Sequence, residues 1–377
     1  MKFETFKAGR WTQRLQYKSF EPVPVNHEWT WEDPTTNALL EKANRALGEL
    51  NAFSLIVPDV DLFIRMHVVK EAQTSSRIEG TQTGIDEALL PEEAILPEKR
   101  DDWREVQNYI EAVNTAVAEL ERLPLSNRLL KQAHAILMQG VRGERKTPGE
   151  FRLSQNWIGG SGLADAAFIP PHPQGVPELM GDLELFWHNE AITVPHLVRV
   201  AISHYQFETI HPFLDGNGRI GRLLVPLYLI SHGLLAKPSL YLSDFFERNR
   251  ASYYDALTRV RTSNDLIHWV RFFLSGVAET AGKGRDVFRQ ILELRTESER
   301  AVQGLGKRAA LAQQAVNAFY STPMMTAADL TRRLGVTHPT ANRLIGELVR
   351  LGILSEVTGR QKGRSYAFDR YLDLFLM

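Results

Sequence analysis

Apolar residues recur every three or four positions along most of this chain, the pattern of helices with one buried face. Between residues 35 and 50 the apolar positions follow this spacing, and other stretches repeat it before a glycine or a proline. We therefore expect a mainly α-helical fold. The predicted helices span residues 35–50, 60–79, 103–122, 127–138, 175–189, 196–209, 218–232, 247–261 and 266–304, and the last is long enough to be two helices that meet near residues 281–284.

Two segments depart from the helical pattern. The first 35 or so residues are expected to be irregular, with Trp29 and Trp31 packing them onto the rest of the molecule. Residues 149–173 are rich in glycine and proline and carry short β-branched or aromatic runs, which predict a small β-hairpin with loops.

The composition changes again near residues 303–306. Three short predicted helices and then two predicted strands follow, an order typical of a winged helix-turn-helix domain. The helices span residues 310–320, 326–334 and 340–351, and the strands 354–357 and 365–368. The expected organisation is an N-terminal helical extension (1–100), a helical core with one hairpin (101–303) and a winged helix domain (304–377).

The composition excludes several kinds of chemistry. The chain has 377 residues and no cysteine, so disulfides, thiolate catalysis and zinc sites made of cysteine are ruled out. The formal net charge is -1, so the whole molecule has no strong attraction to nucleic acid or membrane. No apolar run approaches the ~18 residues of a membrane span, and the N-terminal residues do not form a secretory signal. We expect a cytoplasmic protein without a membrane partner.

One segment of twelve residues concentrates side chains with chemical function. It lies between two predicted helices and reads His211-Pro-Phe-Leu-Asp-Gly-Asn-Gly-Arg-Ile-Gly-Arg222. The small residues at positions 216–218 let backbone N–H groups point at an anion, and the following helix adds the positive end of its dipole. Arg219 and Arg222 are three residues apart and share one face of that helix.

These residue types suit a reaction on a polyphosphate. Two guanidinium groups beside an anion-binding loop can grip phosphate oxygens. Asp215 can hold a Mg²⁺ ion that bridges two phosphates, and His211 can take the proton of an attacking hydroxyl. The segment therefore indicates phosphoryl or nucleotidyl transfer.

Other interpretations of the segment are weaker. Residues 216–221 match the dinucleotide fingerprint G-x-G-x-x-G, but that motif follows a strand and this one follows a predicted helix. The chain contains no G-x-x-x-x-G-K-[ST] phosphate loop. A plain helix start with surface arginines remains as the structural alternative.

The segment resembles the signature of the Fic/Doc family, H-x-F-x-[DE]-G-N-G-R-x-x-R, at every defined position. The resemblance implies a Fic-type helical core with a hairpin flap, formed here by residues 149–173. It also implies transfer of AMP from ATP to a Ser, Thr or Tyr hydroxyl of a target protein or of the enzyme itself. No lysine replaces the glycine after the acid, as it does in Doc kinases.

The same resemblance implies a role for each motif residue. His211 would be the general base and Asp215 the Mg²⁺ ligand. Arg219 would grip the phosphates of ATP and Arg222 its γ-phosphate. The residues that would line the anion hole are Gly216, Asn217 and Gly218.

A second stretch resembles the family's inhibitory motif, [S/T]-x-x-x-E-[GN]. It reads Thr74-Ser-Ser-Arg-Ile-Glu-Gly80, with Ser75 and Glu79 four residues apart and so on one helix face. The resemblance implies that Glu79 pairs with Arg222 within the ATP site and blocks productive placement of the γ-phosphate. Taken alone, the pattern would equally fit a solvated helix end.

Further expectations rest on less specific patterns. Residues 245–254 resemble the family's wall around the adenosine, where Asn249 and Tyr254 either contact ATP or pack between helices. Residues 332–364 hold seven Lys or Arg and two Asp or Glu, a local charge of +5. The helix that opens at residues 337–343 would then face a DNA major groove. The domain would otherwise serve dimerisation or target docking.

Two rival functions stay open at this point. One is a DNA-binding regulator whose core only senses a nucleotide, and the other is an enzyme that removes AMP, with Glu79 positioning a water. The intact histidine, acid, asparagine and arginines of the motif favour transfer. The target protein, the oligomeric state and the signal that releases Glu79 are not encoded in any pattern that we recognise.

Overall fold

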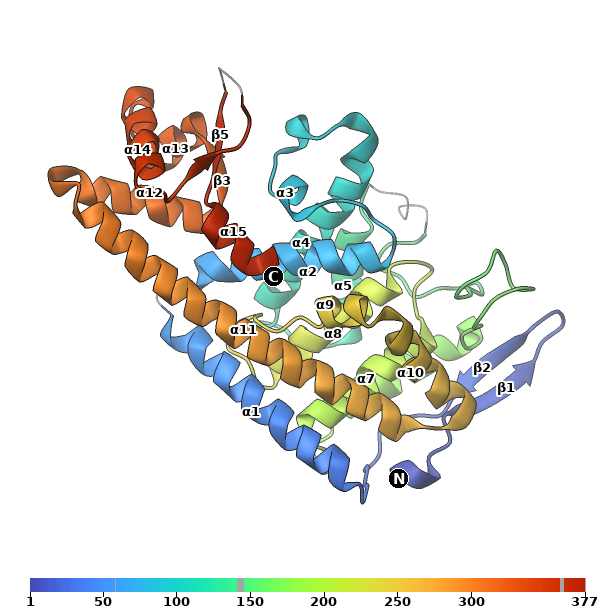
Figure 1. Cartoon of the computed structure of the whole chain (residues 1–377). Helices are drawn as coiled ribbons and strands as arrows, with labels where there is room; N and C mark the ends of the chain where they lie inside the picture. Colours follow the sequence, from blue (N-terminus) through green and yellow to red (C-terminus); the bar gives the residue numbers. More distant parts are fainter. Residues whose placement is uncertain (58, 141–145, 360–362, 377) are drawn as a thin grey trace.

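The computed structural model describes residues 1–57, 59–140, 146–359 and 363–376. This part of the chain is mainly helical, as predicted, with small antiparallel sheets (Figure 1). The helices are α1 (Pro34–Ile56), α2 (Val60–Ile78), α3 (Ile85–Ala88), α4 (Arg100–Glu119), α5 (Asn127–Leu137), α6 (Val176–His188), α7 (His196–Ile210), α8 (Asn217–Ser231), α9 (Ser243–Arg248), α10 (Arg250–Ser263), α11 (Leu266–Gln303), α12 (Ala309–Ser321), α13 (Ala327–Leu334), α14 (His338–Arg350) and α15 (Asp369–Leu376). The strands are β1 (Gly9–Gln13), β2 (Lys18–Pro22), β3 (Met324–Thr326), β4 (Ser355–Glu356) and β5 (Ser365–Ala367).

Helices α7 and α8 form the centre of the molecule. Every residue from Leu197 to Ile210 is buried, and so is every residue from Arg219 to Leu229. A helix that is covered on all sides in this way belongs to the core, and polar groups on it need partners inside the protein. The short loop 211–216 joins the two helices, so the predicted chemistry lies at the end of a pair of buried helices.

Helices α1 and α11 lie side by side along one edge of the molecule (Figure 1). Ion pairs join successive points of α11 to the N-cap of α1, to its middle and to the residue before α2, so the two helices run in the same direction. The pairs are Arg271 with Asp33, Arg285 with Glu49 and Arg295 with Asp59.

Helix α11 is continuous, although the sequence allowed a break near residues 281–284. Glycine lowers helix propensity, but Ala281 is buried and Gly284 packs closely against Leu50 of α1. The opposite correction applies to the helix predicted over residues 247–261. It is two helices, α9 and α10, because the Asn249 side chain donates to the Phe245 carbonyl and ends α9 there.

The first 35 residues are not irregular, as we expected, but contain a β-hairpin. Strands β1 and β2 pair antiparallel with Trp11 opposite Phe20. Both strands are short, β1 is mostly exposed and the buried positions of β2 do not alternate, so the apolar pattern is too weak to be recognised from sequence. As predicted, Trp29 is buried and Trp31 packs on Phe3, which holds this region on the body.

The hairpin predicted over residues 149–173 is reduced to a single antiparallel bridge between Ile158 and Phe168. The loop between them is held by the Asp165 carboxylate, which accepts hydrogen bonds from the backbone of Ser161 and Gly162. This segment lies against β2, where the Phe20 N–H donates to the Ile169 carbonyl.

The C-terminal residues form helices α12, α13 and α14 with a three-stranded sheet in the order β3-β5-β4. Strand β3 and helix α15 were not predicted. β3 has three residues, and its last residue, Thr326, also caps α13 in a reciprocal capping box with Asp329. Helix α15 returns to the helical body and packs against α2 and α11 (Figure 1).

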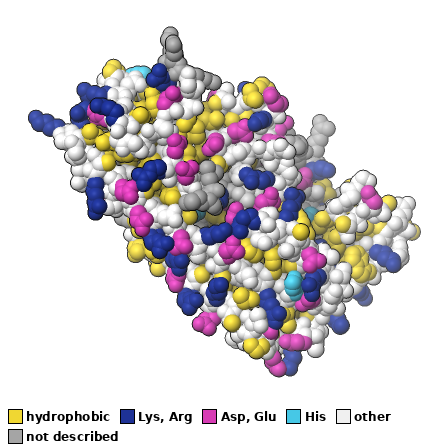
Figure 2. Space-filling model, viewed as in Figure 1, with side chains coloured by type: hydrophobic (Ala, Val, Ile, Leu, Met, Phe, Trp, Pro, Cys, Tyr) yellow, Lys and Arg dark blue, Asp and Glu magenta, His cyan; other side chains and the backbone are white. Residues whose placement is uncertain are grey.

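Charged side chains of both signs are interspersed over the face shown in Figure 2. This agrees with the near-zero net charge. None of the helices in the described ranges is long and apolar enough to cross a membrane.

Candidate active site

The loop between α7 and α8 has two residues in the left-handed backbone region. His211 ends α7 with φ 50°, and Gly216 precedes α8 with φ 73°. Between them, the Asn217 side chain accepts from the Phe213 N–H and donates to the Phe213 carbonyl, each at 2.8 Å. The Asn217 side chain therefore fixes the conformation of the loop, and the Asn217 backbone N–H remains available to bind an anion.

His134 of α5 supports the same loop from one side. Its ring stacks on Phe213 with centroids 3.8 Å apart, and its Nε2 lies 3.0 Å from the Asp215 carbonyl. Its Nδ1 accepts from the Gly149 N–H, so Nε2 carries the proton. A Cβ atom on Gly216 would lie 2.9 Å from the sulfur of Met138, so this close contact requires glycine as much as the backbone angle does.

Residues 149–173 support the loop from the other side. The Arg152 guanidinium and the Asn156 amide both donate to the His211 carbonyl, at 2.9 and 3.1 Å. Arg152 is 1% exposed and also donates to the Pro171 carbonyl. A buried arginine that is satisfied by backbone carbonyls fixes the position of His211 through the main chain.

The His211 imidazole is neutral in this environment. Burial, with the nearby charges of Arg261 and Arg152, lowers the pKa of His211 to about 3. Its Nδ1 lies 3.9 Å from a Glu208 oxygen and is buried without a hydrogen bond among the described residues. Burial raises the pKa of Glu208 to about 7. A neutral imidazole can accept a proton at once, as a general base must.

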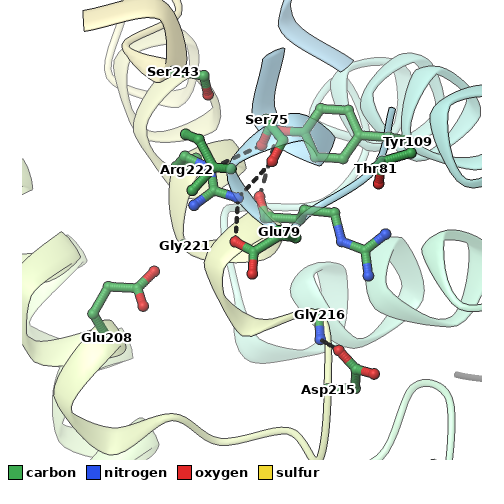
Figure 3. Close-up of polar contacts among 12 residues, drawn as sticks. Ser75, Glu79, Thr81, Tyr109, Glu208, Asp215, Gly216, Gly221, Arg222 and Ser243 are labelled. Carbon is green, nitrogen blue, oxygen red and sulfur yellow. Dashed lines mark hydrogen bonds and ion pairs between the residues drawn. The ribbon is translucent and has the colours of Figure 1, made fainter. Parts of the chain in front are cut away.

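Asp215 is exposed at the start of α8. One carboxylate oxygen accepts from the Gly216 N–H at 2.6 Å, as Figure 3 shows, and the other is available. In the described part of the chain, no group of three or more His, Asp or Glu side chains is arranged to hold a metal ion. A Mg²⁺ ion on Asp215 would therefore need oxygens from the substrate.

The two motif arginines lie on the buried side of α8. Arg219 pairs with Glu105 of α4 at 3.2 Å. Arg222 donates through Nε to the Ser75 hydroxyl at 2.8 Å and through a terminal nitrogen to the Ser75 carbonyl at 3.0 Å. The same terminal nitrogen of Arg222 pairs with Glu79 at 2.6 Å (Figure 3).

Glu79 thus places a carboxylate directly over the start of α8. Burial alone would raise the pKa of Glu79, but the charge and hydrogen bond of Arg222 outweigh it, so the pKa lies below its ordinary value. A Cβ atom on Gly218 would overlap a Glu79 carboxylate oxygen. The Glu79 carboxylate occupies the place at which the helix N-terminus and Arg222 would meet an external anion.

Asn249 and Tyr254, the two residues expected from less specific patterns, lie in different surroundings. Asn249 sits at the junction of α9 and α10, where its amide is bound to the Phe245 carbonyl. Tyr254 is 41% exposed and lies close to Glu79 and Arg222. Burial raises the pKa of Tyr254, the charge of Glu79 adds to the rise, and the charge of Arg222 opposes it. The geometry brings Tyr254 to the edge of the site and turns the Asn249 side chain toward its own helix.

Sequence reasoning missed a set of buried polar residues behind the motif. The Glu71 carboxylate accepts from the Ser243 hydroxyl at 2.6 Å and from the Tyr109 hydroxyl at 3.0 Å. Burial raises the pKa of Glu71 to about 7. The signal for Glu71 and Glu208 was present, since each is a carboxylate on an otherwise buried helix face. The missed supporting residues are Glu71, Glu105, Tyr109, His134, Arg152, Asn156, Glu208 and Ser243.

Known proteins share this site and fold. Residues 37–118 match the family model described as Fic/DOC family N-terminal, and residues 124–229 match the one described as Fic/DOC family. The chain belongs to the Fic/DOC family.

Relatives within the family carry more specific names. The chain is 33% identical over 141 residues to the protein adenylyltransferase Fic of Drosophila erecta, a match covering 37% of this chain and 25% of that protein. It is 31% identical over 196 residues to a probable protein adenylyltransferase of Aquifex aeolicus, covering 50% of this chain and 53% of that one. The match thus spans about a quarter of the insect relative and about half of the bacterial one.

Solved structures share the fold. A Fic family protein from Desulfovibrio desulfuricans superimposes with a TM-score of 0.58 at 22% identity and covers 89% of this chain and 96% of that chain. A fragment of Fic-1 from C. elegans superimposes with a TM-score of 0.53 at 20% identity and covers 69% of this chain and 74% of that chain.

Proposed function

We propose that this protein is a protein adenylyltransferase that transfers AMP from ATP to a hydroxyl of a target protein. The observation that carries the proposal is the complete loop from His211 to Arg222, in which a neutral histidine, a free carboxylate oxygen and the N-terminus of α8 lie together. The names of the relatives from Drosophila erecta and Aquifex aeolicus support the same reaction.

In the proposed reaction, the target hydroxyl oxygen forms a bond to the α-phosphorus of ATP. The bond between that phosphorus and the bridging oxygen breaks, and pyrophosphate leaves. The hydroxyl proton passes to His211, at Nε2, because Nδ1 is buried toward Glu208. The hydroxyl is that of a Ser, Thr or Tyr, on a partner protein or on the enzyme itself.

Different residues of the loop would bind different phosphates of ATP. Backbone N–H groups of Asn217 and Gly218 would face the anion, with the dipole of α8 behind them, while the Gly216 N–H donates to the Asp215 carboxylate. Asp215 has one free carboxylate oxygen and so fits a Mg²⁺ ion shared with the phosphates, which would offset their negative charge. Arg219 and, once released from Glu79, Arg222 hold the outer phosphates, while Tyr254 reaches the nucleoside.

We further propose that the chain inhibits itself through Ser75 and Glu79. Arg222 is engaged by Ser75 and Glu79 through Nε and one terminal nitrogen, at distances from 2.6 to 3.0 Å. While this pair stands, Arg222 cannot hold a γ-phosphate, and ATP would bind with its α-phosphorus out of line. Release of Glu79 frees the arginine and the space over Gly218.

The proposed transfer is tested by incubating the full chain and a cell lysate with ATP labelled on either the α- or the γ-phosphate. Label on protein from α-labelled ATP alone is expected, because AMP is transferred and pyrophosphate leaves. Label from γ-labelled ATP instead would identify a kinase. Loss of α-label from a pre-labelled target, without any gain on fresh target, would identify AMP removal.

A second proposal concerns residues 304–377, which we assign as a winged helix domain that binds DNA. The supporting observation is the exposed face at the start of α14, where His338, Asn342 and Arg343 are all accessible. These side chains suit the edges and phosphates of a major groove. The proposed domains of the chain are thus the N-terminal extension (1–100), the core (101–303) and the winged helix domain (304–377). The formation of a homodimer stays a prediction.

A further inference from the structure

A pocket of about 390 Å³ lies outside the proposed ATP site and is lined by residues of α2, α9, α11 and α15 and of the segment that precedes α9. On α2 it is lined by residues from His67 to Thr74, in the turns that precede Ser75 and Glu79. Part of its wall is apolar and comes from Val287, Leu374 and Phe375. Its size is that of a site for a small organic molecule.

Several residues that line this pocket carry a buried polar side-chain atom without a hydrogen bond within the described ranges of the chain. Three of the residues that carry them are almost fully buried: Glu71 is 3% exposed, Ser239 4% and Tyr241 8%. Each unsatisfied group of this kind costs ~1–3 kcal/mol, so a partner inside the pocket is favoured. The atoms are Glu71 Oε2, His67 Nε2, Ser239 Oγ, the Tyr241 hydroxyl and Thr280 Oγ1.

Both cationic and acidic side chains line the pocket, and Lys70 is the cation that an anionic ligand would meet. Two of its carboxylates are already paired, Asp244 with Arg248 at 3.0 Å and Asp286 with Arg285 at 2.9 Å. The Lys70 ammonium lines the pocket and makes no hydrogen bond to any described residue, although the charge of Asp244 acts on it.

Lys283 adds a second ammonium group to the lining and forms an ion pair with Glu279 at 3.2 Å. The positive charges of Lys283 and Arg248 repel the positive charge of Lys70. An anion placed between these cations would therefore be stabilised.

We propose that this pocket binds a small organic anion, with its carboxylate or phosphate toward Lys70 and Lys283. An amino or hydroxyl group on the same molecule donates to Glu71 Oε2 at the floor of the pocket. The hydroxyl groups of Tyr241, Ser239 and Thr280 provide further partners, and the apolar wall covers the carbon skeleton.

The pocket is connected to the inhibitory pair by a chain of hydrogen bonds. The other oxygen of Glu71, Oε1, accepts from the Tyr109 hydroxyl, and Ser75 lies close enough to this hydroxyl to act on the pKa of Tyr109. The Ser75 hydroxyl accepts from Arg222, and Arg222 pairs with Glu79. A ligand that binds Glu71 therefore changes the surroundings of Tyr109 and Ser75, and with them the hold on Arg222, whose contacts with Ser75 and Glu79 are drawn in Figure 3.

Binding is tested without ATP, by calorimetry and thermal shift on the full chain. The probes are L-aspartate, L-glutamate, citrate, 3-phosphoglycerate and AMP, each at millimolar concentration. At least one probe is expected to bind wild type and to lose at least ~10-fold in affinity to Lys70→Met and to Thr280→Val, two changes on separate helices. Lys42→Met removes an exposed lysine of α1 and is expected to bind like wild type.

No binding by any of these probes overturns the site, and so does equal binding by wild type and both pocket variants. Unchanged melting of the variants without probe establishes that a loss of affinity is not a loss of fold. AMP also fits the proposed ATP site, so its binding counts for the pocket only where the pocket variants weaken it.

The effect on Glu79 rests on the proposed AMP transfer, so it is measured separately. The best probe is expected to change AMP incorporation by wild type several-fold, and to change it less in Tyr109→Phe, which binds the probe but breaks the chain of hydrogen bonds. An equal response in Tyr109→Phe would overturn the connection. If no AMP transfer is found in any variant, the proposed function fails while the binding result stands.

Discussion

At the scale of single residues, burial decides the protonation of the groups behind the loop. Glu208 shows the consequence most clearly, because burial raises its pKa to about 7 from an ordinary value of 4.5. Between those two values the folded protein keeps a proton that the unfolded chain has lost, so stability falls as the pH rises through this window. Above pH 7 the Glu208 carboxylate is charged in both the folded and the unfolded state. The folded state then carries the full free-energy cost of burying this charge.

The Glu208→Gln variant tests this assignment. The amide has nearly the same shape and no charge, so its free energy of unfolding relative to wild type should rise by ~1–3 kcal/mol between pH 5 and pH 8. Denaturant unfolding at both pH values measures this difference. A constant difference across that range would mean that Glu208 titrates at its ordinary value.

His211 is the residue on which the proposed chemistry depends. His211→Ala should lower AMP incorporation by ~10²–10⁴-fold and leave ATP binding largely intact, because the side chain takes a proton and does not hold the phosphates. His338→Ala, on the exposed face of α14, is the matched control and should keep the wild-type rate. A parent rate in His211→Ala would show that another group is the base.

Much of the loop was predictable from its residues, and its support was not. The order histidine, acid, glycines and arginines predicts an anion-binding loop before a helix, and the structure has that loop. The contacts that hold it come from α5 and from residues 149–173. No local pattern links Arg152 or His134 to a loop some sixty to eighty residues later, since tertiary packing alone brings them together.

At the scale of elements, the helices were predictable wherever a long apolar stripe continues. The elements that were missed or predicted with the wrong bounds have separate physical causes. Strands β1 to β3 are short, so their alternation is too brief to detect, whereas β4 and β5 lie within the predicted strands 354–357 and 365–368. Helix α11 continues through two glycines because packing against α1 outweighs their low propensity, and the Asn249 side chain divides the next helix pair in a way that periodicity does not reveal.

Helix α14 carries the prediction for DNA binding. If its exposed N-terminal face enters a major groove, affinity should fall steeply with salt, because each Lys or Arg that meets a phosphate releases counterions. Arg343→Ala should weaken binding and lower the salt slope by about one unit if that side chain contacts a phosphate. Gel-shift titrations at two salt concentrations measure both effects. An absence of binding at low salt would assign residues 304–377 to docking or dimerisation instead.

At the scale of the whole molecule, the C-terminal helix α15 packs on α2, the helix that carries Ser75. Tyr371 of α15 is fully buried and packs edge-on against Phe63 of α2 and Tyr320 of α12. The last helix thus joins the C-terminal region to the element that carries Ser75 and Glu79. Any movement of one is felt by the other through this aromatic contact.

Tyr371→Ala should therefore destabilise the protein by ~3–5 kcal/mol, the range for removal of a large buried aromatic side chain. Thermal or denaturant unfolding measures the loss. Tyr254→Ala, at a partly exposed position, should cost ~1 kcal/mol or less. A small effect at Tyr371 would mean that α15 is not anchored on α2.

The account as a whole rests on AMP transfer that Glu79 holds back, and AMP incorporation by Glu79→Gly tests it most directly. Wild type, Glu79→Gly, Arg222→Ala, the double variant and an exposed-site control, Glu121→Gly, are compared at equal concentration with α-labelled ATP. Glu79→Gly should incorporate ~10²-fold more AMP than wild type, because the freed Arg222 brings the phosphates into line. Glu79→Asp should act partly, Glu121→Gly should match wild type, and the double variant should stay inactive. Equal labelling by wild type and Glu79→Gly, or no labelling by either, would contradict the account.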